Sequence, residues 1–274
     1  VLLVANGDDE WPAGVIELVG KRLSVVRVNA SEKSTSEIDY SSVRILVGGP
    51  SNLAPWINFC PKLEWIQSTW AGVDALAGLI PDGVVVTPLK HVFGQSMSEF
   101  VFGWILALER RILDRAQASI WDDTPEMGVF GRTMGILGTG SIGSAVAKTA
   151  QHFGIRCRGL NSDGLAVDGF ETCFKAGDHR FFDDLDFVVS VLPKTTHTEN
   201  AIDQEALNRL SPGSIVINIG RGNAIDDDAL LTALRNGAVG AAGFEVFCEE
   251  PLPKSHPYLQ QEKVFLLGIV PSAF

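Results

Sequence analysis

A glycine-rich segment carries the clearest chemical implication in this sequence. Gly138, Gly140 and Gly143 follow the spacing G-x-G-x-x-G between an apolar stretch and an amphipathic one. The first glycine permits a tight turn, the second lets backbone approach a pyrophosphate, and the third lets a helix pack closely on the preceding strand. Helix amides then bind the diphosphate. The pattern predicts a dinucleotide site at Gly138, Thr139, Gly140, Ser141 and Ile142, with a turn that binds no ligand as the alternative.

The residues that would meet the adenosine ribose leave the choice of dinucleotide open. In this fingerprint an acid about 20 positions on selects NAD, whereas a nearby Arg accommodates NADP. The sequence has Asn161 and Ser162 there, with Asp163 just beyond the expected strand end and Arg158 on the strand. The prediction is therefore NADP or NAD, with a preference for NADP.

A second candidate for chemistry is Arg221, which follows the apolar stretch "SIVINIG" at 214–220. Doubly wound sheets bind ligands at the carboxyl ends of their strands. The fixed charge and forked donors of arginine suit both a carboxylate and a polarised carbonyl. Arg221 is therefore a candidate catalytic residue, and a purely structural ion pair is the alternative.

The elements that must position these residues are buried parallel strands that alternate with longer amphipathic stretches. Residues 1 to about 95 indicate one open α/β sheet, and a second begins at 133. Between them, Ser96 and Glu99 have the spacing of a capping box, which predicts one helix from Met97 to about Ala118. Strands are expected in the second half at 133–138, 156–161, 186–192, 214–220, 239–246 and 264–268.

Composition excludes several classes of protein. A formal net charge of −11 provides no basic field for nucleic acid. No apolar run approaches the roughly 20 residues of a membrane span, and the first residues do not resemble a signal peptide, so a cytoplasmic protein with no membrane partner is expected. The four cysteines are scattered without metal-ligand spacing, which predicts reduced thiols and no metal site.

Several segments together resemble the D-isomer-specific 2-hydroxyacid dehydrogenase family, in particular its glyoxylate and hydroxypyruvate reductase branch. They are "WIQSTWAGVDAL" (65–76), "GRTMGILGTGSIG" (131–143), "VSVLPKTTHT" (189–198), "INIGRGNAIDDDALLTALRNG" (217–237) and "FEVFCEEPLP" (244–253). The resemblance implies an α/β fold with two doubly wound parallel-sheet domains. These are a flavodoxin-like substrate domain at 1–96 plus 269–274 and a Rossmann dinucleotide-binding domain at 97–268. It also implies a homodimer.

The resemblance assigns further roles to residues of this chain. Backbone amides in the turn at 70–73, ahead of a helix near Asp74, would hold a substrate carboxylate. Glu250 would be the acidic catalytic residue, which normally orients a histidine. The substrate-binding positions are Trp70, Ala71, Gly72 and Val73, and the further cofactor-binding positions are Leu192, Pro193, Thr195, Ile219, Gly220 and Glu245, the last an Asp in the family.

The family's catalytic histidine has no match in this sequence. Ungapped counting places Ile269 at its position, and small shifts offer Val270 or Ser272. His91 and His256 are the candidate substitutes. Two hypotheses follow. One is an oxidoreductase, impaired by this loss, that transfers hydride between NAD(P)H and a small 2-keto or 2-hydroxy acid. The other is a non-catalytic, redox-responsive dinucleotide-binding module.

Overall fold

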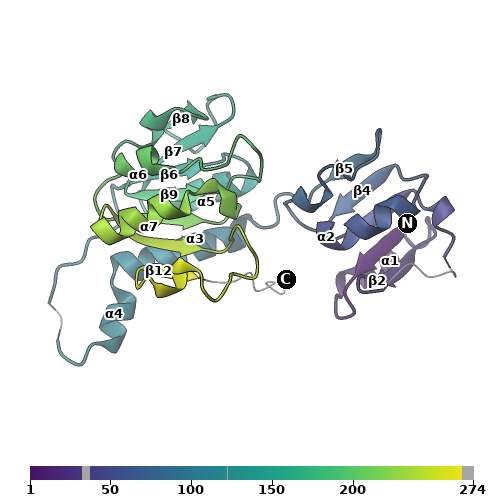
Figure 1. Ribbon diagram of the computed structural model, residues 1–274, viewed down its shortest axis with the longest axis horizontal. Coiled ribbons are helices and arrows are strands. Elements are labelled where there is room, and N and C mark those ends of the chain that lie inside the picture. The colour runs from purple at the N-terminus through teal and green to yellow at the C-terminus, as the bar shows by residue number, and fades with distance from the viewer. Residues whose placement is uncertain (33–37, 122, 267–274) are drawn as a thin grey trace. The chain divides into compact units, whose positions relative to one another are not determined.

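Parallel strands form two separate sheets in this protein (Figure 1). The computed structural model describes residues 1–32, 38–121 and 123–266. Contacts divide the chain into two compact units, Val1–Val92 and Phe93–Phe274, here called unit 1 and unit 2. Each unit contains one of the sheets, and each is described by itself.

The sheet of unit 1 has the strand order β2-β1-β3-β4-β5. This is the flavodoxin-like order 2-1-3-4-5, so the prediction of a doubly wound sheet is confirmed here. The strands form because short apolar runs such as Leu2–Ala5 are buried on both faces. The elements of unit 1 are β1 (Leu2–Ala5), α1 (Trp11–Val19), β2 (Val26–Asn29), β3 (Ile45–Gly48), α2 (Pro50–Leu53), β4 (Trp65–Ser68) and β5 (Val85–Thr87).

The sheet of unit 2 has seven parallel strands in the order β12-β11-β10-β9-β6-β7-β8. Its order is that of a Rossmann fold, and the chain reverses direction across the sheet between β6 and β9. Its strands and helices are α3 (Gly94–Glu109), α4 (Ile112–Gln117), β6 (Thr133–Leu137), α5 (Ser141–His152), β7 (Arg156–Asn161), β8 (Thr172–Lys175), β9 (Phe187–Ser190), α6 (Gln204–Asn208), β10 (Ser214–Asn218), α7 (Asp227–Asn236), β11 (Val239–Phe244) and β12 (Val264–Leu266).

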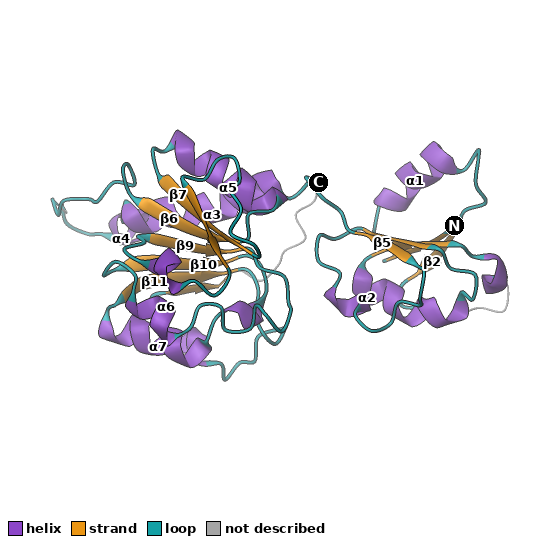
Figure 2. Ribbon diagram, turned by 90° about the horizontal axis from the view of Figure 1, so that it is seen from above, coloured by secondary structure: helices purple, strands orange, loops and turns teal. Residues whose placement is uncertain are grey.

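Helices cover both faces of the seven-stranded sheet (Figure 2). On one face α3 and α5 pack over a core that includes Ile105 and Val146. On the other face α6 and α7 pack over a core that includes Leu207 and Leu230. Because β6, β9 and β10 lie between these layers, every residue in them is buried. These central strands therefore provide a rigid base for the loops at their carboxyl ends.

The expected helix from Met97 to about Ala118 is wrong in two respects. The helix begins earlier, at Gly94, and Glu99 accepts a hydrogen bond from Gln95 rather than closing a capping box with Ser96. It also ends at Glu109, because Arg111 adopts a left-handed conformation with φ of 49° that interrupts the helical hydrogen bonds before α4.

Two further local expectations differ from the structure. The helix expected near Asp74 is a single 3₁₀ turn, Asp74–Leu76. The strand β8 was not among those predicted, because no residue of Thr172–Lys175 is fully buried and the strand lies at the sheet edge. β8 pairs with β7 and so extends the sheet beside the predicted ribose site.

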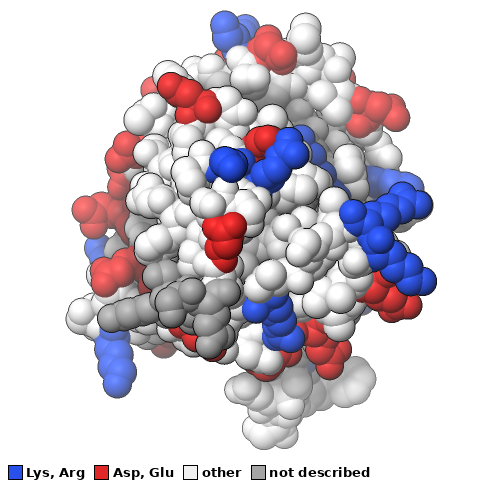
Figure 3. All heavy atoms as spheres, turned by 90° about the vertical axis from the view of Figure 1, so that its right-hand side faces the viewer, with Lys and Arg blue, Asp and Glu red and all other residues white. Residues whose placement is uncertain are grey.

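Charged side chains of both signs are interspersed with uncharged ones on the face in Figure 3. Neither sign covers this face as a single continuous field. Among the described residues, no helix combines the length and the apolar character needed to cross a membrane.

Candidate functional site

The glycine-rich turn, residues 138–143, connects β6 to α5 and is built as its spacing predicts. Gly138 has a φ of 99°, which favours glycine. A Cβ on Gly143 would overlap the carbonyl oxygen of Gly138, so only glycine lets the helix approach this closely. A Cβ on Gly140, in contrast, would meet nothing within 4 Å. No side chain caps α5, so the first amides of this helix lie beside the open space at Gly140, where the diphosphate is predicted to bind.

The segment that begins at Leu192 lies between two glycine turns. A Cβ on Gly138 would lie 3.1 Å from the carbonyl oxygen of Val191, and one on Gly220 would lie 2.6 Å from the backbone nitrogen of Leu192. Ile219 donates a backbone hydrogen bond to Ser190 at 3.0 Å. The structure thus brings Gly138, Leu192, Ile219 and Gly220 together, as their proposed cofactor roles require.

A small hydrogen-bonded turn holds Pro193 and Thr195. The Thr198 hydroxyl donates to the carbonyl oxygen of Pro193 at 2.7 Å, and it accepts from the Thr195 amide at 2.9 Å. These bonds fix the backbone of the L-P-x-T motif immediately after the buried strand β9.

Asn161 at the end of β7 builds the loop around the predicted ribose site. Its amide nitrogen donates to the Leu165 carbonyl at 2.9 Å and to the Thr139 hydroxyl at 3.2 Å. Its amide oxygen accepts from the Gly164 amide at 2.7 Å. Asn161 therefore ties the strand end to the glycine-rich turn, and the exposed Ser162 is next in the chain.

Arg221 follows β10 in an extended conformation that Asn218 helps to fix. The buried Asn218 side chain donates to the Arg221 carbonyl at 2.9 Å and accepts from the Gly220 amide at 3.1 Å. The Arg221 guanidinium itself donates to the Gly220 carbonyl at 2.7 Å. The partly buried guanidinium thus starts from a rigid turn at the carboxyl end of the sheet.

Glu245 occupies the same edge of the sheet, one strand away. Its backbone amide donates to the Asn218 carbonyl at 3.1 Å, in register with the β10–β11 pairing. Burial raises the pKa of the Glu245 carboxyl above its ordinary value. A carboxyl group of this kind holds a proton more readily than a solvated one.

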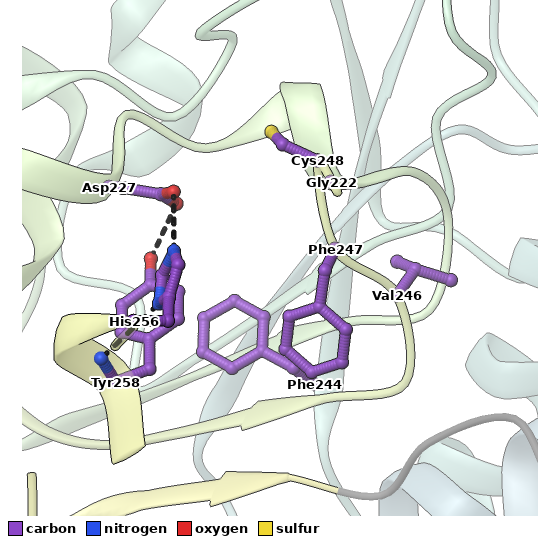
Figure 4. A pocket seen from close by; sticks show the side chains of 8 residues that line it. All are labelled: Gly222, Asp227, Phe244, Val246, Phe247, Cys248, His256 and Tyr258. Atoms are coloured by element: carbon purple, nitrogen blue, oxygen red, sulfur yellow. Dashed lines mark hydrogen bonds and ion pairs between the residues drawn. The ribbon is translucent and has the colours of Figure 1, made fainter. Parts of the chain in front are cut away.

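The Glu250 loop, residues 245–256, packs directly on the turn that follows Arg221. A Cβ on Gly222 would overlap the backbone of Phe247 and Cys248, so this glycine permits the contact (Figure 4). The exposed Glu250 carboxylate accepts from the Phe247 amide at 2.9 Å. The segments that carry Arg221 and Glu250 are therefore packed together.

A hydrogen-bonded cluster at α7 anchors the end of the Glu250 loop (Figure 4). The phenol of the buried Tyr258 donates to Asp227 at 2.6 Å. Burial and the Asp227 carboxylate raise the pKa of Tyr258, so the phenol remains a donor. His256 Nδ1 accepts from the Tyr258 amide at 3.3 Å, and its Nε2 lies 3.7 Å from Asp227. His256 thus acts as a cap in this cluster.

In unit 1, the turn at 70–73 is where a carboxylate-binding set of backbone amides is predicted. The hydroxyl of the buried Ser68 accepts from the Trp70 amide at 2.9 Å and so fixes the start of the turn. Within the described chain, the next three amides donate no hydrogen bond. Donors that folding leaves available suit a carboxylate. They belong to Ala71, Gly72 and Val73.

Of the positions considered for the missing catalytic histidine, the structure describes the substitute candidate His91 but not those near the end of the sequence. His91 is exposed, with a φ of 65°, and it precedes α3. The positions to which the missing histidine was assigned, Ile269, Val270 and Ser272, lie outside the described residues.

Some residues that position the site were not predicted. Asn218 carried a usable signal, because an amide that directly follows the apolar run 215–217 of a buried strand requires hydrogen-bond partners. Asp227 and Tyr258 carried none, because they are 31 positions apart and meet only in the folded chain.

Comparisons with known proteins agree with this arrangement. The family model described as "D-isomer specific 2-hydroxyacid dehydrogenase, NAD binding domain" matches residues 102–268. Glyoxylate/hydroxypyruvate reductase B from Pectobacterium carotovorum subsp. carotovorum is 34% identical over 232 residues, which are 80% of this chain and 72% of that protein.

Solved structures give the same result over nearly the whole chain. A D-isomer-specific 2-hydroxyacid dehydrogenase family protein from Aeromonas salmonicida has a TM-score of 0.83 and 35% identity, covering 97% of this chain and 87% of that one. One from Xanthobacter autotrophicus, in complex with NADPH and MES, has a TM-score of 0.84 and 28% identity, covering 97% and 86%.

Proposed function

Because this chain belongs to the D-isomer-specific 2-hydroxyacid dehydrogenase family and uses NAD(P), we propose that it reduces a small 2-keto acid of the glyoxylate or hydroxypyruvate type. The observation that carries the proposal is the position of Arg221. Arg221 follows Gly220, which packs against the backbone of Leu192. The residue before Leu192, Val191, packs against Gly138 of the glycine-rich turn. This position supports the proposal that Arg221 binds the substrate carbonyl beside the cofactor.

The proposed roles follow from the chemistry of each group. NAD(P)H supplies the hydride when bound, and one proton from water completes the 2-hydroxy acid. Arg221 binds the substrate and polarises its carbonyl, since its donors are fixed and permanently charged. The amides of Ala71, Gly72 and Val73 hold the substrate carboxylate, and Glu250 is the acidic residue beside this chemistry.

The test is a steady-state assay of NAD(P)H oxidation at 340 nm with glyoxylate, hydroxypyruvate and pyruvate. We expect turnover with at least one of them. Arg221→Gln should lower kcat/KM by about 10²- to 10³-fold, as loss of a charge-stabilising donor does. Its Kd for NAD(P)H should stay within about twofold, since binding and polarising the keto acid are separate from binding the dinucleotide.

The matched control is Arg235→Gln, which removes the same charge from an exposed position in the last turn of α7. It should leave kcat/KM unchanged. Tight NAD(P)H binding without turnover of any keto acid would contradict the proposal and support a non-catalytic module. The relatives reported above are reductases and dehydrogenases by name, which favours the enzyme.

We also infer a cytoplasmic homodimer. α4 and the loop after it project from the rest of unit 2 (Figure 1). Large apolar side chains on this segment are exposed. Surfaces of this kind mark association sites, and a second copy of the chain is the simplest symmetric partner. Free cysteines suit a reducing compartment. The exposed apolar residues are Ile112, Leu113, Ile120, Trp121, Met127 and Phe130.

A further inference from the structure

The edge strand β8 places a lysine beside the predicted ribose site. In the parallel pairing of β7 with β8, Asn161 is in register with Lys175, and Gly159 is in register with Cys173. Residues two apart on a strand share a face, and partners in register lie side by side on that face. A Cβ on Gly159 would lie 2.6 Å from the Thr139 methyl group, so this face meets the glycine-rich turn.

Lys175 is also exposed and available. Among the described residues it forms no side-chain hydrogen bond or ion pair. A Cβ on Gly164 would lie 3.2 Å from the Lys175 Cβ, so the lysine side chain starts beside the turn that contains Ser162. Its flexible four-carbon stem can carry the ammonium group along that turn.

The other charged groups near this turn have different partners. Arg158 is on the opposite face of β7 and donates to the Asp183 carbonyl at 2.6 Å. Asp163 is the acid in the turn, and its Oδ1 accepts from the Leu165 amide at 3.0 Å. The strand end itself carries the amide Asn161 where a carboxylate would bind the ribose hydroxyls of NAD. An amide at the strand end and an available lysine beside it therefore favour a cofactor whose ribose carries a phosphate group.

We propose that this chain prefers NADP(H) to NAD(H), with Lys175 as the specificity-determining cation and the Ser162 hydroxyl as a second donor to the ribose 2′-phosphate. The inference deepens the proposed function and rests on it, because it concerns the reductant of the same reaction. A phosphate monoester carries a charge of about −1.5 to −2 near neutral pH, and lysine binds it as a point charge.

The test compares two probes that differ only in the 2′-phosphate, adenosine 2′,5′-bisphosphate and 5′-AMP, by titration calorimetry on the full chain. We expect the bisphosphate to bind at least about tenfold more tightly, since a cation within reach of the phosphate forms a charge-assisted hydrogen bond. Lys175→Gln should remove most of this ratio and leave the Kd of 5′-AMP unchanged, which also shows that the variant is folded. Ser162→Ala should give an intermediate ratio.

The control is Lys263→Gln, which changes the net charge equally beside β12 at the other edge of the sheet. It should keep the wild-type ratio. A wild-type ratio near one, or a ratio that survives Lys175→Gln, would overturn the inference. Neither reading needs a keto acid, so preferential binding without turnover would support this inference while contradicting the proposed reductase activity.

Discussion

The carboxyl group of Glu245 links a single side chain to the stability of the fold. Burial raises its pKa above the ordinary value of 4.5, so the folded state holds this proton more tightly than the unfolded state. The free energy of unfolding includes the full contribution of this difference at pH values below the ordinary pKa, which the unfolded state retains. It is lost as the pH rises through the raised pKa of the folded protein, because an ionised carboxylate must then stay partly buried.

Glu245→Gln tests this at the residue scale. We expect the variant to gain free energy of unfolding relative to wild type as the pH increases from about 4 to 7, because the amide cannot ionise. Urea unfolding of both proteins across this range measures the difference. Glu262→Gln, at an exposed position, should show no such trend. A difference that is constant with pH would contradict the raised pKa.

At the scale of elements, the packing of the Glu250 loop on the turn after β10 is the feature most open to test. Gly222→Ala would place a methyl group against the Phe247 and Cys248 backbone, which must shift. We expect the free energy of unfolding to fall by about 1 to 3 kcal/mol, the usual cost of overpacking. We also expect kcat/KM to decrease, because the loop that carries Glu250 has to move away from Arg221.

Urea unfolding and the 340 nm assay measure the two effects. Gly128→Ala is the matched control, because its added methyl group would meet nothing within 4 Å. If Gly222→Ala keeps wild-type stability and activity, the packing of this loop does not position the site.

Some helices and strands could be predicted from the sequence, and others could not. The strand expected at 156–161 is β7 to the residue, because Arg156 and Arg158 alternate with the buried Cys157 and Gly159, which is the period-2 pattern of a strand. The break at Arg111 was missed, because arginine gives no signal for a left-handed conformation. The glycine spacing predicted the tight turn at 138–143, because the positive φ of Gly138 and the close approach at Gly143 depend on neighbouring residues in the sequence. The contact of Asp227 with Tyr258 depends on tertiary folding, which local patterns do not specify.

For the whole molecule, the proposed dimer depends on the exposed apolar residues after α4. Trp121 is 91% exposed, and a charge there would be desolvated in an interface. We expect Trp121→Glu to shift sedimentation velocity from dimer to monomer at micromolar concentration, while wild type remains dimeric. Leu18→Glu changes an 81% exposed residue of α1 and should keep the dimer. A wild-type monomer would contradict the proposed assembly.

Each unit also contains a buried cysteine, whose rate of chemical labelling can measure local unfolding of that unit. Cys60 in unit 1 and Cys157 in unit 2 are each 2% exposed, and burial raises their pKa values to about 11 and about 12. Alkylation in native buffer therefore requires transient exposure, and its rate measures how often that unit opens. A dinucleotide at about 100 times its Kd should slow labelling of Cys157 about a hundredfold and spare Cys60, as mass spectrometry can resolve. Equal slowing at both would mean that the units open in one cooperative step.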